Sequence, residues 1–232
     1  MSNLPQKGDP IIFLDIETLP CQRDDPLWLK LSGNVEKLRT ETDEEFEARL
    51  ESLYRNSALH AALGTVWMIG YAQGSQEPQI IASSGTPEEE KELLAQFLKI
   101  VADIQDPWWV GHNISGYDIP FMQVRALKHG LPQLARKLRQ VRAKPWEQRI
   151  LDTMEIWPRT GSDRTSWKDD SLRGFGRLDT VCSVLGIEQQ TGVMGDSVYK
   201  AFLEGNAEAV RSHLYSDIDQ VRQVFRKLWH IL

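Results

Sequence analysis

The sequence has few cysteines, no long apolar run and no overall excess of positive charge. Its two cysteines, Cys21 and Cys182, are too few for a disulfide framework, so we expect a reducing, cytoplasmic location. No apolar run reaches the roughly 18 residues that a membrane-spanning helix needs, and the polar start MSNLPQKGDP lacks the apolar core of a signal peptide. The 232 residues, 41% of them hydrophobic, exclude intrinsic disorder and predict a globular protein with no membrane partner.

The net charge of −6 hides an uneven distribution along the chain. Residues 121–150 contain eight basic residues and one acidic residue, Glu147, whereas acidic residues concentrate in 41–51 and 88–92. We interpret the two acidic segments as solvated helix faces or helix starts. Clustered Lys and Arg residues can bind phosphate groups, but the same pattern is also typical of an ordinary solvated helix. Charge alone leaves both interpretations of the basic stretch open.

Apolar runs and turn residues predict a single α/β domain over residues 1–232, with an insertion at about 21–64. We expect strands at 11–14, 65–72, 79–82, 108–110 and 150–154, the second and third forming a hairpin. Thr42-x-x-Glu45 and Thr86-Pro87-Glu88 are typical helix starts. Further helices are expected from about residues 119 and 134, and near the end of the chain, where Leu214, Ile218, Val221, Phe225 and Leu228 recur with helical spacing. This order predicts a mixed sheet flanked by helices.

The first motif that carries chemistry is Asp15-Ile16-Glu17, directly after the first apolar run. Residues i and i+2 of a strand point to the same side, so both carboxylates emerge together. Two such groups repel each other unless a cation lies between them, and their hard oxygen ligands suit Mg²⁺ or Mn²⁺. The alternative is an ordinary acidic pair at the end of a strand.

Two more motifs follow later in the chain. Asn113 and Asp118 lie in the segment GHNISGYDIPF, after the fourth expected strand, where Asp118 could also simply cap a helix. Tyr215 and Asp219 lie one turn apart on the last expected helix, so they share a face and could act on one ligand. Viewed alone, this spacing favours an ordinary surface pair.

Taken in order, Asp-x-Glu, Asn-x(4)-Asp and Tyr-x(3)-Asp resemble the three motifs of the DEDD superfamily of 3′-5′ exonucleases, in its tyrosine (DEDDy) form. The segments FLDIET, GHNISGYDIPF and YSDID look most similar to the proofreading exonuclease domain of family B DNA polymerases, especially its stand-alone bacterial and phage relatives. The resemblance runs from about Pro10 to Phe225. It implies a ribonuclease H-like α/β fold with a mixed five-stranded sheet whose first three strands are antiparallel.

The resemblance also implies roles for five residues. Asp15 would bridge two divalent metal ions, Mg²⁺ or Mn²⁺, Glu17 and Asp219 would complete the first metal site, and Asp118 would hold the second. Tyr215 would orient the attacking water. A histidine form of the third motif would need His-x(4)-Asp, but the residue at that distance from His213 is Ile218, so the tyrosine form is favoured.

The expected activity is metal-dependent removal of nucleoside 5′-monophosphates from the 3′ end of single-stranded DNA. Candidate substrate-binding residues are Thr18, Asn113, Arg136, Arg139, Arg164 and Lys168. Two alternatives remain open: an RNA-trimming exonuclease of the same chemistry, and a catalytically silent nucleic-acid-binding module of the same fold. Because only 13 residues follow Asp219, we expect no attached polymerase, and any polymerase or replication and repair partner would act in trans. The sequence suggests only a substrate-shaping or partner surface for the insertion.

Overall fold

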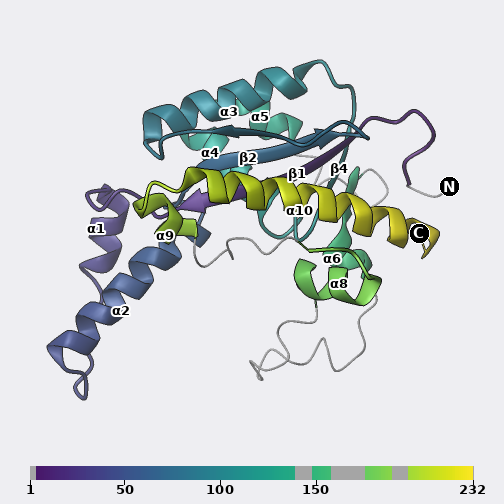
Figure 1. Ribbon diagram of the computed structural model, residues 1–232. Coiled ribbons are helices and arrows are strands. Elements are labelled where there is room, and N and C mark those ends of the chain that lie inside the picture. The colour runs from purple at the N-terminus through teal and green to yellow at the C-terminus, as the bar shows by residue number, and fades with distance from the viewer. Residues whose placement is uncertain (1–3, 139–147, 158–175, 190–197, 232) are drawn as a thin grey trace.

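The computed structural model describes residues 4–138, 148–157, 176–189 and 198–231, and a mixed five-stranded sheet forms its centre (Figure 1). The strand order is β3-β2-β1-β4-β5, in which β2 pairs antiparallel with both of its neighbours, β1 and β3, and β4 and β5 run parallel to β1. The strands are β1 (Ile11–Leu19), β2 (Thr65–Gln73), β3 (Gln79–Ala82), β4 (Trp108–Gly111) and β5 (Ile150–Asp152). The expected mixed sheet, including its three antiparallel strands, is confirmed.

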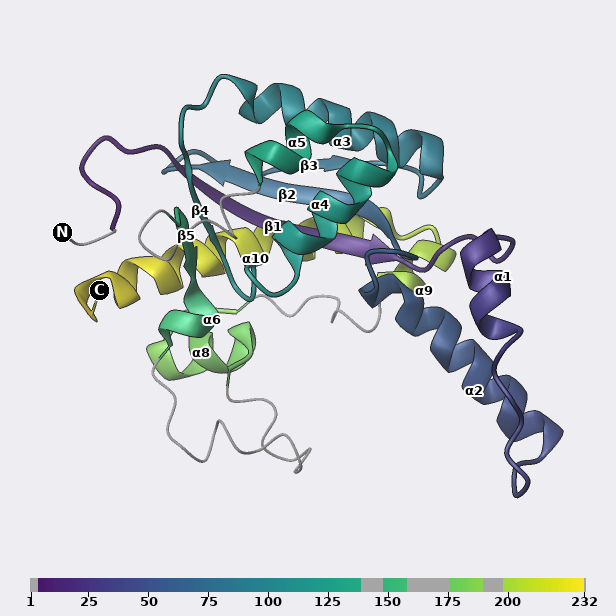
Figure 2. The same cartoon turned by 180° about the vertical axis from the view of Figure 1, so that it is seen from behind.

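Helices cover both faces of this sheet. One face carries α3, α4 and α5, and the long helix α10 crosses the other face (Figures 1 and 2). The helices are α1 (Pro26–Ser32), α2 (Asp43–Asn56), α3 (Pro87–Ala102), α4 (Asp118–Lys128), α5 (Pro132–Lys137), α6 (Thr153–Ile156), α8 (Leu178–Leu185), α9 (Val198–Leu203) and α10 (Ala207–Leu228), with 3-10 turns η1 (Ser57–Leu59) and η6 (Trp229–Ile231). Within the described residues, none of these helices is long and apolar enough to cross a membrane.

The alternation of side chains along β1 decides which face receives the acidic residues. Ile12, Leu14 and Ile16 pack into the buried cluster that contains residues of α3 and α4. Phe13 instead packs with apolar residues of α10. Because side chains alternate along a strand, Asp15 and Glu17 share the α10 face with Phe13.

Local capping signals start two helices where the sequence predicts them. Thr42 and Glu45 form the reciprocal hydrogen bonds of a capping box at the start of α2, and the Thr86 side chain accepts a hydrogen bond from the Glu89 amide at the start of α3. The fifth strand ends two residues earlier than expected. Its last residue, Asp152, accepts a hydrogen bond from the Met154 amide and thereby caps α6.

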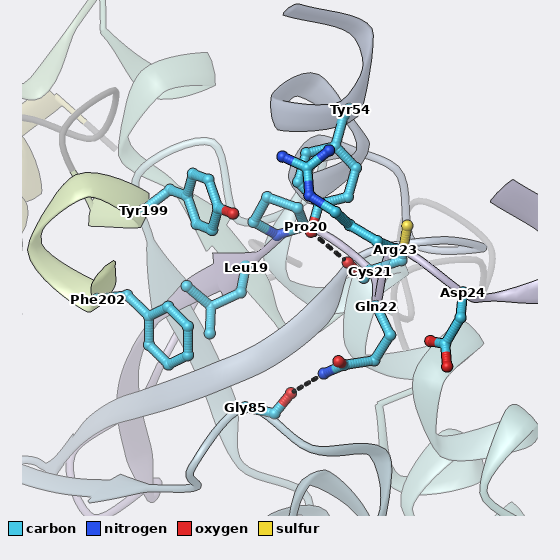
Figure 3. A pocket seen from close by; sticks show the side chains of 10 residues that line it. All are labelled: Leu19, Pro20, Cys21, Gln22, Arg23, Asp24, Tyr54, Gly85, Tyr199 and Phe202. Carbon is cyan, nitrogen blue, oxygen red and sulfur yellow. Dashed lines mark hydrogen bonds between the residues drawn. The ribbon is translucent and has the colours of Figure 1, made fainter. Parts of the chain in front are cut away.

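Residues 21–64, which we call the arm, contain α1, α2 and η1 and project from one end of the sheet (Figure 2). The base of the arm is tied to the body by buried Cys21, Tyr54 and Leu63. Tyr54 donates a hydrogen bond of 2.9 Å to the carbonyl of Cys21, and Arg23 lies 4.0 Å above the Tyr54 ring (Figure 3). These contacts hold the arm at the end of β1, next to Glu17.

The acidic segment 88–92 is not wholly solvated, which corrects our interpretation. Glu90 is fully buried and accepts hydrogen bonds from Arg125, at 2.5 and 2.8 Å, and from the Val66 amide at 2.8 Å. A third contact joins Glu90 to His129 at 2.6 Å. A buried carboxylate needs such partners, and here they come from another helix and a strand. This cluster ties α3 and α4 to β2.

Candidate active site

Asp15 and Glu17 provide the first two carboxylates of the site from one face of β1. Both are partly buried, and the Glu17 side chain is 12% exposed. The pairing of β1 with β2 shifts register between Glu17 and Thr18. Such bulges often occur beside active sites, where they change the direction of a side chain.

Asp118 joins these two residues from a different element. β4 pairs with β1 only along Ile11–Phe13, so the edge of β1 beyond this point is not covered by a strand. The segment that follows β4 places Asp118 at that edge, where its Oδ1 accepts a 3.0 Å hydrogen bond from the buried Ile16 amide. The first turn of α4 is therefore fixed against the middle of β1. The motif spacing brings Asp118 to Asp15, as the sequence predicts.

The segment between β4 and α4 is itself held by Asp152 at the end of β5. The carboxylate of Asp152 accepts hydrogen bonds from the amides of Asn113, at 2.8 Å, and Ser115, at 3.0 Å. Asn113 has a positive φ of 65°, a conformation that asparagine adopts more readily than most residues. These bonds give Asn113 a structural role, and its side chain is exposed.

Helix α10 contributes His213 and Asp217 to the site. The His213 Nε2 lies 3.4 Å from an oxygen of Asp217 and 4.0 Å from an oxygen of Glu17. A close approach of α10 to the sheet makes this possible. Gly70, opposite Asp15 in the β1–β2 register, has no side chain, and a Cβ there would lie only 2.7 Å from the Cγ of Leu214.

The structure does not bring Tyr215 and Asp219 to the carboxylates of β1, where the sequence prediction places them. The Tyr215 hydroxyl donates to Glu77, and 38% of the residue is exposed. Asp219 pairs with Arg222 and accepts a 2.8 Å hydrogen bond from Gln223. Both residues lie on a part of α10 that faces away from β1. Of the acidic side chains on this helix, Asp217 is the one that approaches Asp15.

The apolar pattern of α10 already contains the signal that distinguishes the two aspartates. Leu214, Ile218, Val221 and Phe225 are buried, and they define the stripe that faces the sheet. Asp217 follows Leu214 by three residues and precedes Val221 by four, so it borders this stripe. Asp219 is neither three nor four residues from any of these four buried residues, so it does not border the stripe. The phase of the helix therefore places the carboxylate correctly, whereas the motif spacing does not.

Burial raises the pKa values of all four carboxyl groups, and a charge within the cluster adds to it at Asp15, Glu17 and Asp118. Burial is the main cause for Asp15, whose pKa rises to about 7, and the charge of Asp217 adds to it. Burial followed by the charge of Asp15 also raises the pKa of Glu17 and of Asp118. The pKa of Asp217 rises to about 7 for the same first reason. Burial lowers the pKa of His213 and so disfavours its charged form, although His213 is the potential cation that the described residues place beside these carboxyl groups.

Four oxygen-donating side chains in this setting suit hard divalent cations. The charges of Asp15 and Asp118 disfavour each other's ionised form, which adds to the effect of burial on the pKa of Asp118. In the part of the chain that the structure describes, no three His, Cys, Asp or Glu side chains already form a complete metal-ligand set. The chemistry of the donor set nevertheless fits Mg²⁺ or Mn²⁺, which bind carboxylates and retain several waters.

The six candidate substrate-binding residues differ in where they lie. The Thr18 hydroxyl donates to the carbonyl of Ala58 at 2.9 Å and contacts Tyr117, so it anchors the arm beside the site. Arg136 is exposed on α5. Arg139, Arg164 and Lys168 lie outside the described residues.

Several other members of the basic stretch serve the fold. Arg125 is buried against Glu90, and the Lys137 ammonium donates to the carbonyls of Ala102 and Ile104 near the end of α3. Arg149 lies 5.5 Å from the Trp108 ring. The described part of this stretch is therefore less available to nucleic acid than its charge suggests.

Comparisons with known proteins show the family and the fold of the chain. Residues 58–231 match the family described as predicted 3′-5′ exonucleases related to the exonuclease domain of PolB. The structure is similar to the family B DNA polymerase of the archaeon Pyrobaculum calidifontis, with a TM-score of 0.59 and 16% sequence identity. This similarity covers 96% of the chain and 25% of the polymerase, which shows the fold. No curated protein sequence matches the chain. The match over most of its length shows that the chain belongs to the family of predicted 3′-5′ exonucleases related to the PolB exonuclease domain.

Proposed function

We propose that the protein is a divalent-metal-dependent exonuclease that shortens single-stranded DNA from its 3′ end. One observation carries the proposal: Asp15, Glu17, Asp118 and Asp217 converge on β1 from three elements, and among the described residues His213 is the potential cation beside them. A fold does not gather four acids with little exposure to solvent without cost, because each ionised carboxylate raises the free energy of the others. Their convergence is explained if cations bind there.

Each residue of the cluster has a task in this proposal. Asp15, in the centre, would hold both cations, with Glu17, Asp118 and Asp217 as the outer ligands. Divalent cations bound there would stabilise charge on the attacking and leaving oxygens of phosphodiester hydrolysis. Water adds to phosphorus, the bond from phosphorus to the 3′ oxygen of the preceding nucleotide breaks, and a nucleoside 5′-monophosphate leaves. We assign to His213, which lies beside Glu17 and Asp217, the water-orienting role first expected of Tyr215.

The family relation to a DNA polymerase exonuclease domain supports DNA as the substrate. RNA remains the alternative substrate, because a protein distinguishes the two through contacts to the 2′-hydroxyl. A catalytically silent nucleic-acid-binding module is a weaker alternative, since such a module has no use for four converging acids.

The decisive experiment incubates DNA and RNA oligonucleotides, labelled at the 5′ end, with the protein and Mn²⁺, Mg²⁺ or EDTA. We expect a ladder of DNA products that shortens from the 3′ end with either metal and is absent with EDTA. Faster shortening of RNA would reassign the substrate. Binding without any shortening would favour the silent module, and activity in EDTA would contradict metal dependence.

A further inference from the structure

Asp152, the last residue of β5, is a buried carboxylate outside the cluster on β1, and it is 4% exposed. Its Oδ1 accepts hydrogen bonds from the amides of Asn113 at 2.8 Å and Met154 at 2.9 Å. Its Oδ2 accepts hydrogen bonds from the amide of Ser115 at 3.0 Å and from the hydroxyl of the same residue at 2.7 Å. Because protein donors occupy both oxygens, Asp152 is suited to hold chain segments in place rather than to bind a cation.

The turn from Asn113 to Tyr117 connects Asp152 to the site. The Asn113 carbonyl accepts hydrogen bonds from the Gly116 amide at 3.1 Å and from the Tyr117 amide at 2.9 Å. A Cβ at Gly116 would lie only 2.5 Å from the Asn113 Oδ1, so the turn closes this tightly because residue 116 is a glycine. Asp118 follows the turn directly. A constraint on Asn113 and Ser115 therefore also constrains the position of Asp118.

The backbone of Asn113 needs support from outside the turn. Its φ of 65° is a conformation that residues other than glycine keep only when their surroundings enforce it. Asp152 supplies this support, although it lies 39 positions later in the sequence and on a different element. The order of the chain alone does not bring the two residues together.

The far end of the turn is fixed against β1 and α4. The Oδ1 of Asp118 accepts the 3.0 Å hydrogen bond from the Ile16 amide, and Asp118 is 2% exposed. The Tyr117 hydroxyl lies 2.7 Å from the Thr18 hydroxyl, and the Ile119 amide donates to the Ile114 carbonyl at 3.2 Å. Asp118 is thus held between Asp152 on one side and β1 on the other.

We propose that Asp152 is a positioning residue for the metal site, an inference that rests on the proposed function. Its carboxylate holds the turn so that the Asp118 carboxylate lies beside Asp15, where both can bind cations. In this role Asp152 contacts neither cation nor DNA, and it acts through Asn113 and Ser115. Residues that orient metal ligands from outside typically change metal affinity or activity about 10- to 100-fold when they are mutated.

The test compares wild type with Asp152→Asn and Ser115→Ala. Asparagine is also a good N-cap, so the start of α6 should be preserved, but its NH₂ group would face the Ser115 donors in place of Oδ2. Ser115→Ala removes one of these donors and leaves Asp152 itself intact. Glu155→Gln is the matched control, because Glu155 is an exposed residue of α6 that contacts the same Ser115 hydroxyl at 2.9 Å.

Two quantities report on the position of Asp118 without any cleavage assay. The first is the hydrogen-exchange rate of the Ile16 amide in the metal-free protein, compared with the amides of β1 that bond to β2. The second is the affinity for Mn²⁺ by calorimetry in the absence of DNA. Single-turnover cleavage of a DNA oligonucleotide and thermal unfolding are measured alongside, so that a general loss of stability is recognised.

We expect Asp152→Asn to exchange the Ile16 amide several-fold faster than wild type, with the other β1 amides unchanged. Its Mn²⁺ affinity and its cleavage rate should each fall about 10-fold or more. Ser115→Ala should change all three quantities in the same direction but less, and Glu155→Gln should match wild type. A merely structural role for Asp152 would lower the unfolding temperature and leave Ile16 exchange and Mn²⁺ affinity as in wild type.

Two further outcomes keep this inference distinct from the proposed function. If the wild type degrades DNA but Asp152→Asn keeps wild-type Ile16 exchange and Mn²⁺ affinity, the inference is overturned and the exonuclease proposal stands. Should Asp152→Asn fail to fold, the same result in Ser115→Ala overturns it. If the wild type neither binds Mn²⁺ nor degrades DNA, the exonuclease proposal fails, and the exchange of Ile16 alone decides whether Asp152 positions Asp118.

Discussion

The two faces of the sheet both bury acidic side chains but balance them differently. On the α3 and α4 face, Glu90 is surrounded by Arg125, His129 and the Val66 amide. On the α10 face, four carboxyl groups meet, and in the part of the chain that the structure describes His213 is the potential cation beside them. The first arrangement has its cationic partners in place, whereas among the described residues the second does not.

The pKa values show the consequence of this difference. Burial raises the pKa of Glu90, but the hydrogen bonds from His129 and Arg125 outweigh it, and the value falls below that of an ordinary glutamate. Burial also dominates at Glu17, where the neighbouring charges come from Asp15 and Asp217, and the pKa rises well above the ordinary value. Low solvent exposure thus accompanies a structural ion cluster in one place and a candidate cation site in the other. The predictions below test this contrast.

The largest effect should come from Asp217→Asn, with Asp219→Asn as its matched control on the same helix. Asp217→Asn should reduce the rate of single-turnover DNA cleavage about 10²-fold or more, as removal of one group that stabilises transition-state charge does. Asp219→Asn loses a partly exposed pair with Arg222, and Tyr215→Phe loses a bond to Glu77, so both should stay within a few-fold of wild type. A dead Asp219→Asn beside an active Asp217→Asn would contradict the assignment.

Removing Glu90 from its cluster with Arg125 and His129 should change the stability of the protein, whereas Asp217→Asn should change the rate of cleavage. Glu90→Ala leaves the buried Arg125 without its partner and should reduce the free energy of unfolding by about 3–5 kcal/mol. Urea denaturation measures this, with the exposed residue Glu92, changed to Ala, as the control on the same helix. A Glu90→Ala protein as stable as the control would show that the cluster is not a structural anchor.

Adding Mn²⁺ should stabilise the α10 face, because the cations relieve repulsion among its carboxylates. Mass action gives about 2.7 kcal/mol at 100 times the Kd, provided that the unfolded chain binds little metal. The midpoint of thermal unfolding should rise for wild type and for Asp219→Asn but not for Asp15→Asn. Equal shifts in all three proteins would place the bound metal elsewhere.

The smallest expected effect comes from Gly70→Ala, which adds a methyl group where α10 packs on β2. Its Cβ would meet the Cγ of Leu214 at 2.7 Å, so the helix must shift away from the sheet. Overpacking of this kind costs about 1–3 kcal/mol. Because Asp217 lies on the same helix, the stabilisation by Mn²⁺ should also fall. An unchanged response to Mn²⁺ would show that the site tolerates a shift of α10.

Short-range patterns explain why much of the fold could be predicted. The five strands, the capping box at Thr42 and the start of α3 depend on residues within a few positions of one another. The cluster around Glu90 could not be predicted in this way, because Arg125 is 35 positions distant and looked like one of many basic residues. A partner residue that comes close only when the chain folds leaves no signal in the neighbouring sequence.

The site itself was predicted in part. The position of Asp15 and Glu17 follows from strand alternation, and Asp118 follows from its place after β4. The third motif was placed by spacing to Tyr215, although the apolar stripe through Leu214 and Val221 favours Asp217. The position of a residue relative to the buried stripe of its helix decides which way its side chain points. Here that position favours Asp217, whereas the motif spacing favours Asp219.

The central claim is that the unbalanced carboxylates on the α10 face bind cations. Anomalous diffraction from crystals grown with Mn²⁺ tests it most directly. We predict Mn²⁺ peaks at about 2.1 Å from carboxylate oxygens of Asp15, with Asp217 among the neighbouring ligands and none at Asp219. A peak coordinated by Asp219, or no peak beside Asp15 at saturating Mn²⁺, would contradict the account.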